Sequence, residues 1–500
     1  TLSLHDALPI SVQRRKTFHL CIITKQSEHI MKVEQIYTGC LAQGAYYITS
    51  MGEAAIIDPL REITPYIERL KRDGVRLKYI LETHFHADFV SGHLDLSHAT
   101  GAPIIYGPTA KAGFDTIVAE DGQTFELGKA KIKVIHTPGH TMESSCFLLI
   151  DEEGRETALF SGDTLFLGDV GRPDLAQKAA NLTQEELAGL LYDSLYEKIL
   201  PLSDDIVVYP GHGAGSACGK NMMQETVDSL VNQKRVNYAL KQPDKETFIA
   251  SVIKGLLPPP AYFGGNVAMN KQGYDSLEHI LKRGQSALSA TELEQFVEAS
   301  DALVLDTRSP QTFAQGFIPR SINVGIDGDF APLVGAMIVD VKQPLVLITE
   351  PGREEEVITR LSRVGFDNVL GHLDGGFETW KASGKEIDHV ECISAETLAA
   401  HFPLKEGIIV DIRKEGEYAA EHVEEAYSRP LAYINDWIAD LPRDQHVYLY
   451  CASGYRSMIA ASILQARGYR NFTNVDGGFE AISQTSIPKT DFVCQSRVSK

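Results

Sequence analysis

The chain has no apolar run long enough to cross a bilayer, and its basic residues are outnumbered by acidic ones. A membrane-spanning helix needs about 20 consecutive apolar residues, so none is expected. The 47 lysines and arginines stand against 67 aspartates and glutamates, giving a formal net charge of −20. That balance argues against nucleic acid or an anionic membrane surface as the main partner.

Cysteine is also scarce, with 7 residues in a chain of 500. An odd number without short regular spacing does not indicate a disulfide framework. We therefore expect a reducing, cytoplasmic location, in which any reactive thiol stays free.

The length of the chain exceeds what one hydrophobic core organises and predicts about two to four domains. Residues 1–30 show no clear periodicity, and their basic residues stand in the wrong order for a signal peptide. Met31 is followed at once by strand-like sequence. We expect residues 1–30 to be non-native or disordered, with Met31 as the natural first residue.

Short apolar runs alternate with helical and glycine-rich segments from about residue 36 to residue 209. Such an alternation of strands and helices predicts a mixed α/β layered domain, which we place at residues 31–280. Helices are expected within it at residues 63–73, 184–198 and 221–241.

Metal-capable side chains follow several of these predicted strands. The first group comes directly after an apolar run and contains His84, His86 and Asp88. Imidazole and carboxylate together suit zinc or non-haem iron, and ligands at strand ends leave a site open to substrate. Histidines in turns can simply cap those turns, but the ordered recurrence favours a metal site. The later candidates are His140, Asp163 and His212.

The second half of the chain repeats itself with an offset near one hundred residues, which is a domain-sized period. Each copy alternates strand-like and helical segments and predicts a small parallel α/β domain. We place these domains at residues 285–390 and 391–490. The matching pairs of segments are 288–293 with 393–398, 303–308 with 408–413, and 373–378 with 475–480.

The order Thr-His-x-His-x-Asp, Thr-Pro-Gly-His-Thr, Ser-Gly-Asp-Thr and Pro-Gly-His-Gly resembles the metallo-β-lactamase superfamily. The resemblance implies an αβ/βα sandwich with the metal at one edge between two sheets. That superfamily includes hydrolases such as glyoxalase II and iron-dependent persulfide dioxygenases. By resemblance to the dioxygenases, His84, His140 and Asp163 would hold one Fe(II) per chain, with zinc as the alternative metal.

Phe89 stands where dinuclear hydrolases of this superfamily usually carry another histidine. Phenylalanine cannot donate to a metal, so Asp88 and His212 would be left as a vestigial second site. His86 would then be a weak ligand or a neighbour that orients the true ligands. The substitution therefore favours one metal, and oxygen chemistry over hydrolysis.

Two further segments resemble persulfide dioxygenases. Arg172, in a Gly-Arg-x-Asp segment, would hold a substrate carboxylate through two hydrogen bonds or form a salt bridge with a nearby acid. Cys218 and Lys220 lie in a loop similar to that of dioxygenases fused to sulfurtransferase domains. Both are predicted to contact substrate, and a buried inert thiol is the alternative for Cys218.

The second repeat carries the sequence Cys-Ala-Ser-Gly-Tyr-Arg-Ser where a predicted strand ends and a helix begins. Backbone N–H groups at a helix N-terminus favour a thiolate and bind anions. The Cys-x-x-Gly-x-Arg-Ser spacing resembles the active loop of rhodaneses. The resemblance implies that Cys451 and Arg456 are catalytic and that the substrate is bound by Ser453, Gly454, Tyr455 and Ser457.

The first repeat lacks this chemistry. Thr349 stands where Cys451 stands, and Glu354 stands where Arg456 stands. Without a sulfur nucleophile, and with an acid in the anion loop, this copy is expected to be inactive. The fold can be kept while the chemistry is lost, so we interpret this domain as a spacer or docking unit.

These features resemble a persulfide dioxygenase–rhodanese fusion that serves sulfide detoxification. Such a protein oxidises a low-molecular-weight persulfide with O₂ to sulfite, and its rhodanese cysteine passes sulfur to sulfite, giving thiosulfate. The expected partners are the persulfide, O₂ and sulfite, without nucleic acid or membrane, in a homo-oligomer. The alternatives are a zinc thioester hydrolase of the glyoxalase II type with sulfur-carrier modules, and a non-enzymatic sulfur carrier.

Overall fold

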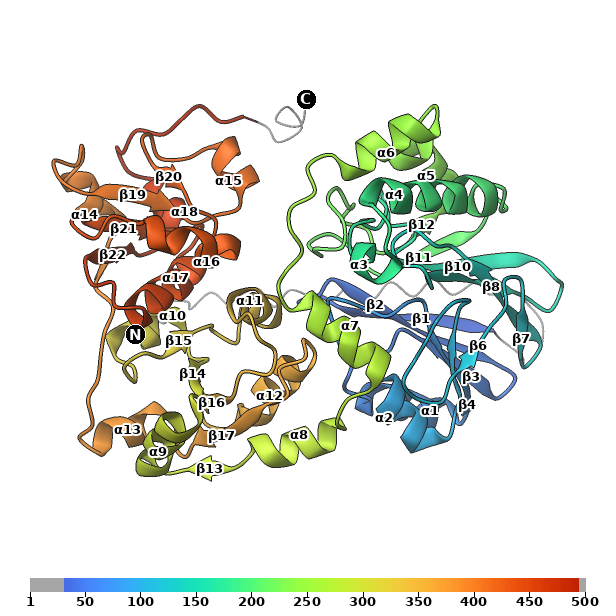
Figure 1. The fold of residues 1–500 in the computed structure, drawn as a ribbon, viewed down its shortest axis with the longest axis horizontal. Helices are drawn as coiled ribbons and strands as arrows, with labels where there is room; N and C mark the ends of the chain where they lie inside the picture. The colour runs from blue at the N-terminus through green and yellow to red at the C-terminus, as the bar shows by residue number, and fades with distance from the viewer. Residues whose placement is uncertain (1–30, 494–500) are drawn as a thin grey trace, which may run out of the picture.

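The computed structural model describes residues 31–493, so the prediction for residues 1–30 lies outside the described residues. Two six-stranded and two five-stranded sheets organise the described part of the chain. Figure 1 shows an N-terminal domain (blue to green) beside a middle domain (yellow) and a C-terminal domain (orange to red). Within residues 31–493, no helix has both the length and the apolar composition that crossing a membrane requires.

The N-terminal domain contains the two six-stranded sheets. The first has the order β1-β2-β3-β4-β5-β6, and the second has the order β12-β11-β10-β9-β8-β7. The strands of the first are β1 (Lys32–Thr38), β2 (Gln43–Ser50), β3 (Glu53–Ile57), β4 (Arg76–Glu82), β5 (Ile104–Tyr106) and β6 (Ile117–Val118). Those of the second are β7 (Thr124–Leu127), β8 (Ala130–His136), β9 (Ser145–Ile150), β10 (Glu156–Gly162), β11 (Val207–Pro210) and β12 (Asp228–Ser229).

Alternating side chains of these strands build three layers of core. In β2, Tyr46 and Ile48 pack against Phe147 and Phe160 of the second sheet. Tyr47 points the other way, into a cluster with α1 and α2. Successive side chains of a strand face opposite sides, so apolar strands bury both faces. The outer cluster of the second sheet packs in the same way against α4, α5 and α6. The predicted αβ/βα sandwich is confirmed.

The helices of this domain are α1 (Thr64–Asp73), α2 (His93–Thr100), α3 (Gln177–Ala180), α4 (Gln184–Asp193), α5 (Leu230–Val236), α6 (Lys245–Ile253), α7 (Phe263–Gln272) and α8 (Leu277–Gly284). A capping box between Thr183 and Glu186 starts α4. The prediction of one helix over residues 221–241 is wrong. Ser229 pairs with Val207 in the sheet and then caps α5 by accepting from the Asn232 N–H, so the helix begins only at Leu230.

The middle and C-terminal domains have the same topology. Their parallel sheets have the orders β13-β17-β16-β14-β15 and β18-β22-β21-β19-β20. The middle domain contains β13 (Ala287–Leu288), β14 (Leu303–Asp306), β15 (Ile322–Asn323), β16 (Leu345–Ile348), β17 (Val369–Leu373), α9 (Ala290–Ser300), α10 (Pro310–Gln315), α11 (Phe330–Met337), α12 (Glu354–Ser362) and α13 (Phe377–Ala382). The C-terminal domain contains β18 (Cys392–Ile393), β19 (Ile408–Asp411), β20 (Tyr427–Ser428), β21 (Val447–Tyr450), β22 (Phe472–Val475), α14 (Ala395–Ala400), α15 (Glu415–Ala420), α16 (Ile434–Trp437), α17 (Tyr455–Ala466) and α18 (Gly478–Ile482).

The repeated sequence motifs have matching structural roles in the two domains. Ser289 and Ser394 each follow the first strand and cap the next helix through a side-chain oxygen. Asp306 forms a buried ion pair with Arg308, and Asp411 forms the same pair with Arg413. The sequence repeat therefore reflects a repeated fold, and the predicted fold class is confirmed.

A buried arginine joins the N-terminal and middle domains. Arg61 is fully buried and donates to the carbonyls of Ser362 and Asp275, at 3.2 and 2.8 Å. It also forms a 2.9 Å ion pair with the carboxylate of Asp367. Arg61 thus joins residues of the N-terminal domain to the carbonyl of Ser362 and the carboxylate of Asp367 in the middle domain.

Replacing Arg61 with alanine is expected to destabilise this docking by about 3–5 kcal/mol, because a buried carboxylate loses its partner. Urea unfolding of the full chain measures the loss. Arg76→Ala is the control, since Arg76 is 73% exposed in its pair with Glu53 and should cost less than about 1 kcal/mol. An Arg61 variant no less stable than the control would contradict the role assigned to Arg61.

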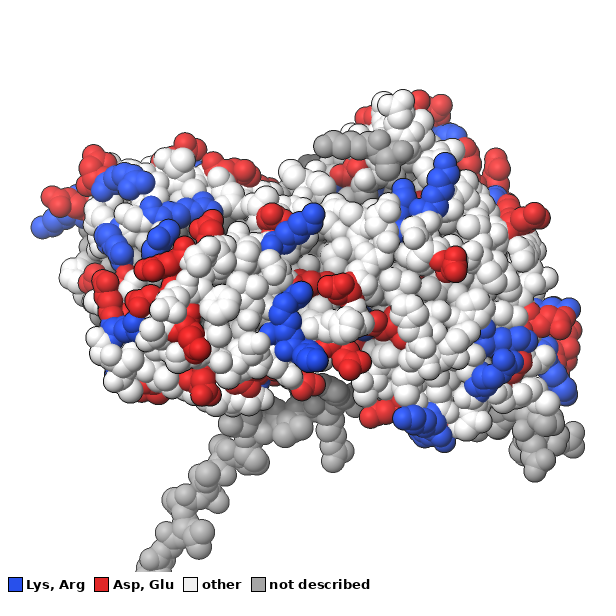
Figure 2. Space-filling view, turned by 60° about the horizontal axis from the view of Figure 1, so that its bottom comes forward, with Lys and Arg blue, Asp and Glu red and all other residues white. Residues whose placement is uncertain are grey.

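The surface carries charges of both signs. On the face in Figure 2, lysine and arginine side chains are interspersed with aspartates and glutamates. Mixed charge of this kind gives that face no large field of one sign.

Candidate functional site

Three metal-capable side chains meet at one edge of the sandwich of the N-terminal domain. His84 lies just beyond the end of β4, His140 lies in the loop after β8, and Asp163 directly follows β10. Their donor atoms all lie within 4.8 Å of one another. The Asp163 Oδ2 atom is 3.5 Å from His140 Nε2 and 3.9 Å from His84 Nε2. The structure thus brings together the three residues that the sequence predicted as metal ligands.

The arrangement fits a metal ion. Two donors about 2.1 Å from one ion lie about 3.0–3.4 Å apart at octahedral or tetrahedral angles, close to the distances found here. His140 Nε2 and Asp163 Oδ2 are buried, and neither has a hydrogen-bond partner among the described residues. Unpartnered buried polar atoms are costly, and a bound cation would satisfy both. Two imidazoles and one carboxylate are donors for Fe(II) or zinc.

Hydrogen bonds to neighbouring residues fix the orientation of the two ligand histidines. His140 Nδ1 donates to the Arg172 carbonyl oxygen at 2.8 Å. His84 Nδ1 lies 3.0 Å from Thr83 Oγ1, whose hydroxyl donates to Asp58. Because these acceptors hold the Nδ1–H, the Nε2 lone pairs of His84 and His140 face the site.

The buried groups around Asp163 determine the protonation states of Asp163 and His84. Burial raises the pKa of Asp163, but His212 and the other nearby histidines outweigh burial and lower it well below the usual range. Burial, with His86 nearby, lowers the pKa of His84 well below its ordinary value. An ionised carboxylate and a neutral imidazole are the forms that bind a metal.

The loop after β4, which carries His84, is held in place by hydrogen bonds from α7 and from the middle domain. The Asn270 amide on α7 donates to the carbonyls of His86 and Phe89, at 2.8 and 2.7 Å, and accepts from the Ser91 N–H. The Val90 N–H donates to the Arg363 carbonyl of the middle domain at 2.7 Å. Sequence patterns gave no signal for Asn270, since it lies far along the chain on a separate helix.

His86 belongs to a neighbouring group of carboxylates. Its Nε2 lies 3.2 Å from Asp58 and 3.4 Å from Glu82, and neither ring nitrogen has a hydrogen-bond partner of good geometry among the described residues. Burial lowers the pKa of His86, but the two carboxylates outweigh burial and raise it to about 10. Asp58 and Glu82 were not predicted, although each stands at the end of an apolar strand.

The predicted second cluster contains Asp88 and His212, together with Cys218. His212 Nε2 lies 2.7 Å from Asp88, and His212 Nδ1 donates to Asp163 at 2.8 Å. The His212 Nε2 and Asp88 Oδ1 atoms are buried and have no hydrogen-bond partner among the described residues. Phe89 is fully buried beside it. The buried Cys218 thiol lies next to both groups, near the metal position as the sequence predicted.

Arg172 and Lys220, which are predicted to contact substrate, are both held by protein acceptors. Arg172 forms a two-pronged pair with Asp174, at 2.7 Å for each bond, and also donates to two carbonyls. Lys220 directs its ammonium group at the carbonyls of Ser251, Val252 and Lys254 near the C-terminus of α6. The salt bridge that was the alternative for Arg172 is present, and substrate binding by either residue stays a prediction.

The second candidate site is the loop between β21 and α17. Cys451 is buried, and its Sγ accepts the Gly454 N–H at 3.1 Å. The Asp-Gly-Gly-Phe motif closes over this loop, because the Phe479 N–H donates to the Cys451 carbonyl at 2.7 Å. Gly478 has φ +55°, and a Cβ there would lie 2.4 Å from that carbonyl oxygen. The motif thus requires glycine to approach the cysteine loop.

The other residues of this loop that were predicted to be catalytic or to bind substrate point in different directions. Arg456 forms a half-buried, two-pronged pair with Glu417 of α15, at 2.6 and 2.8 Å. Ser457 donates to the Gly454 carbonyl and Ser453 is exposed. The Tyr455 side chain points out of the loop toward the middle domain, where its hydroxyl donates to the Gly325 carbonyl, so its predicted substrate contact is left to its backbone and stays a prediction. Glu417 was missed because it lies on a helix distant in sequence.

The matching loop of the middle domain is filled by its own acid. The Glu354 carboxylate accepts from the Gly352 N–H at 2.9 Å and from the Thr349 hydroxyl at 3.2 Å. A carboxylate therefore lies where this loop would bind an anion, and Thr349 offers no sulfur nucleophile.

Known families cover most of the described chain. The metallo-beta-lactamase superfamily model matches residues 38–212, and the rhodanese-like domain model matches residues 289–383 and 394–485. A metallo-beta-lactamase crystal structure from Staphylococcus aureus subsp. aureus COL is 31% identical, with TM-score 0.60, and the match covers 69% of this chain and 98% of that one. The chain belongs to the metallo-beta-lactamase superfamily and carries two rhodanese-like domains.

The curated relatives named below match about a third of this chain. The mitochondrial persulfide dioxygenase ETHE1 of Homo sapiens is 33% identical over 32% of this chain and 59% of its own length. A hydroxyacylglutathione hydrolase of Polaromonas sp. is 35% identical over 36% of this chain and 66% of its own length. The chain thus spans 59% and 66% of the lengths of these two relatives.

Proposed function

We propose that the chain oxidises a low-molecular-weight thiol persulfide with O₂ at one iron centre and transfers sulfur at Cys451. The observation that carries the proposal is the geometry of the two metal clusters. The group of His84, His140 and Asp163 is spaced for an ion, whereas the second cluster has the buried ring of Phe89, which offers no donor atom, beside His212. One metal with two histidines and one carboxylate suits O₂ chemistry.

The residues of the centre would position and neutralise the reactants. Iron held by His84, His140 and Asp163 would supply the redox chemistry that O₂ requires. Asp163, held by His212, keeps a fixed negative charge at the site. The buried thiol of Cys218 lies beside Asp88 and His212 in the neighbouring cluster, where a persulfide sulfur would arrive. One persulfide, one O₂ and one water give one thiol, one sulfite and two protons.

The C-terminal domain would consume the sulfite. The Cys451 thiolate attacks the terminal sulfur of a second persulfide, and the low-molecular-weight thiol leaves. Sulfite then takes this sulfur, giving thiosulfate and restoring the thiolate. The Gly454 N–H on Cys451 Sγ stabilises the thiolate in both steps. Joining the sites in one chain raises the effective concentration of sulfite at Cys451.

A second candidate function is thioester hydrolysis with zinc. It is favoured by the likeness to proteins named hydroxyacylglutathione hydrolase. Phe89 opposes it, since that side chain leaves the second cluster without the additional histidine that dinuclear hydrolases of this superfamily usually carry. The test is O₂ uptake by anaerobically purified, iron-loaded protein given glutathione persulfide, with sulfite measured as product. Hydrolysis of a glutathione thioester by the zinc form, without any persulfide-dependent O₂ uptake, would overturn the proposal.

Replacing Glu417 with glutamine is expected to lower the KM for anionic sulfur donors such as thiosulfate. The variant frees the Arg456 guanidinium from a carboxylate that competes with the anion. A partly exposed pair contributes about 0.2–1 kcal/mol, which corresponds to about a 1.4-fold to fivefold fall in KM with little change in kcat. Glu415→Gln, an exposed acid on the same helix, is the matched control. A KM that rises or stays level in the Glu417 variant would contradict competition for Arg456.

A further inference from the structure

Tyr455 links the catalytic loop to a different domain. It directly follows Gly454, whose N–H donates to Cys451 Sγ. Its hydroxyl leaves the C-terminal domain and donates to the Gly325 carbonyl oxygen of the middle domain at 2.5 Å. The residue next to the sulfur contact is therefore anchored in a domain that has no sulfur nucleophile of its own.

The middle domain receives this ring between two glycines. A Cβ on Gly328 would lie 2.3 Å from the Tyr455 ring, and a Cβ on Gly325 would lie 3.1 Å from it. Neither glycine has a positive φ, so the backbone alone does not require glycine at either position. The missing side chains make room for the ring. We call residues 325–328 the tyrosine socket.

Hydrogen bonds from α12 hold the backbone of the tyrosine socket in place. Arg360 on α12 donates to the carbonyls of Ile326 and Gly328, at 2.5 and 3.2 Å. Next to the socket, the Asn323 N–H donates to the Ser462 hydroxyl of α17 at 3.0 Å. The helix that starts at Tyr455 is thus fixed to the middle domain at a second point.

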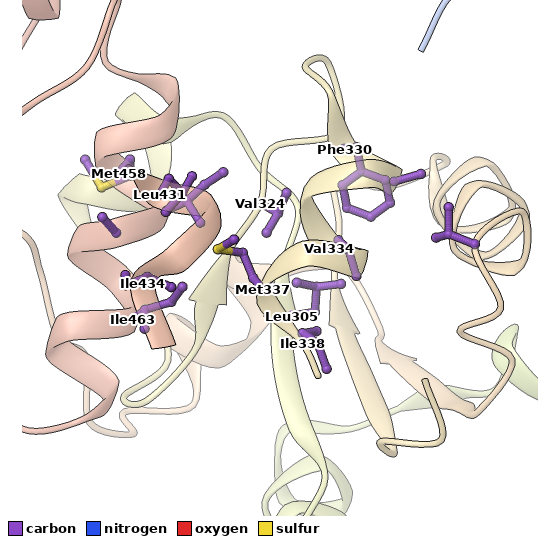
Figure 3. Packing of buried hydrophobic residues seen from close by; sticks show 14 of the residues in the cluster. Leu305, Val324, Phe330, Val334, Met337, Ile338, Leu431, Ile434, Met458 and Ile463 are labelled. Carbon is purple, nitrogen blue, oxygen red and sulfur yellow. The ribbon is translucent and has the colours of Figure 1, made fainter. Parts of the chain in front are cut away.

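Apolar packing surrounds these polar anchors. Figure 3 shows Met458 and Ile434 of the C-terminal domain beside Val324 and Met337 of the middle domain. All four belong to one buried cluster. The contact excludes water and holds α17 in a single position against the socket.

We propose that the inactive middle domain completes the sulfur-transfer site, with the tyrosine socket holding Tyr455 so that the Gly454 N–H stays on Cys451 Sγ. Tyr455 is a positioning residue, since it acts on the sulfur through Gly454. The inference rests on the proposed sulfur transfer at Cys451. It gives the middle domain a function that needs its fold and its two glycines but no cysteine.

The test measures the alkylation rate of Cys451 in the full chain with iodoacetamide at pH 7, followed by mass spectrometry of its peptide. Gly328→Ala pushes the ring out of the socket and is expected to slow alkylation about tenfold, because the thiolate loses a well-placed donor. Tyr455→Phe keeps the ring and should slow it less. Gly264→Ala is the control, since a Cβ there meets open space.

A double variant distinguishes an effect that acts through the Tyr455 ring from a general loss of folding caused by Gly328→Ala. In a Tyr455→Ala background no ring is left to displace, so Gly328→Ala should have no further effect on the alkylation rate. Equal slowing by Gly328→Ala in both backgrounds, or wild-type rates in both Gly328→Ala and Tyr455→Phe, would overturn the socket. Sulfur transfer to sulfite is measured separately. A wild-type chain that transfers no sulfur would overturn the proposed function, and the alkylation comparison would still decide on the socket.

Discussion

Replacing Asp163 with asparagine is expected to remove the metal and to abolish persulfide-dependent O₂ consumption. Asp163 is the residue that both ligand histidines face, through Oδ2, and its Oδ1 accepts from His212. Asparagine keeps the size and an oxygen for His212 but removes the negative charge. Changes around metal ligands cost about 10–100-fold in affinity, and loss of a ligand's charge should cost at least about 100-fold.

Metal content after dialysis and O₂ uptake on an electrode measure this effect. Asp204→Asn is the matched control, because Asp204 is an exposed aspartate paired with Lys234 away from the site. An Asp163 variant that keeps its metal through dialysis and consumes O₂ at the control rate would show that the metal lies elsewhere.

Replacing Cys451 with serine should stop thiosulfate formation while leaving O₂ consumption intact. A serine hydroxyl is a far weaker nucleophile at neutral pH than a thiolate, and it carries no sulfur to form a persulfide. Sulfite made at the metal centre should then accumulate. Thiosulfate should fall to background, and sulfite should rise in its place.

The control for this variant is Cys392→Ser, which changes a half-buried cysteine in the same domain. Ion chromatography of sulfite and thiosulfate, with O₂ uptake recorded in parallel, compares the two. Undiminished thiosulfate in the Cys451 variant would place sulfur transfer at another residue. Loss of O₂ uptake together with thiosulfate would show that the two reactions are not separable.

The metal ligands were predictable because each stands at a strand end in a local motif. The strands that precede these residues end at the same edge of the sandwich, β4 in the first sheet and β8 and β10 in the second, so His84, His140 and Asp163 converge once both sheets form. The cysteine loop was predictable in the same way, from a strand followed by a helix. The alternation of segments predicted a mixed α/β domain and the repeated parallel domains, the family resemblance implied the two-sheet sandwich, and the predicted fold class is confirmed.

Other features depended on partners that lie far apart in sequence. The positive charges of Arg172 and Lys220 do not reveal that carbonyls and Asp174 already saturate them. Cys218 joins Asp88 through an irregular loop with no periodic signal. Tyr455 stands beside the catalytic cysteine in sequence, yet its direction is decided by two glycines of another domain. Long-range packing, which a local pattern does not encode, determined each of these outcomes.

The most direct test of the central claim is the number and identity of metal ions per chain. Elemental analysis of protein purified without oxygen counts them, and the persulfide assay on the same sample shows whether they support O₂ uptake. We predict one iron per chain, lost in the Asp163→Asn variant, with O₂ uptake proportional to iron. Two zinc ions per chain, the second bound by Asp88, His212 and Cys218, without O₂ uptake, would contradict the account.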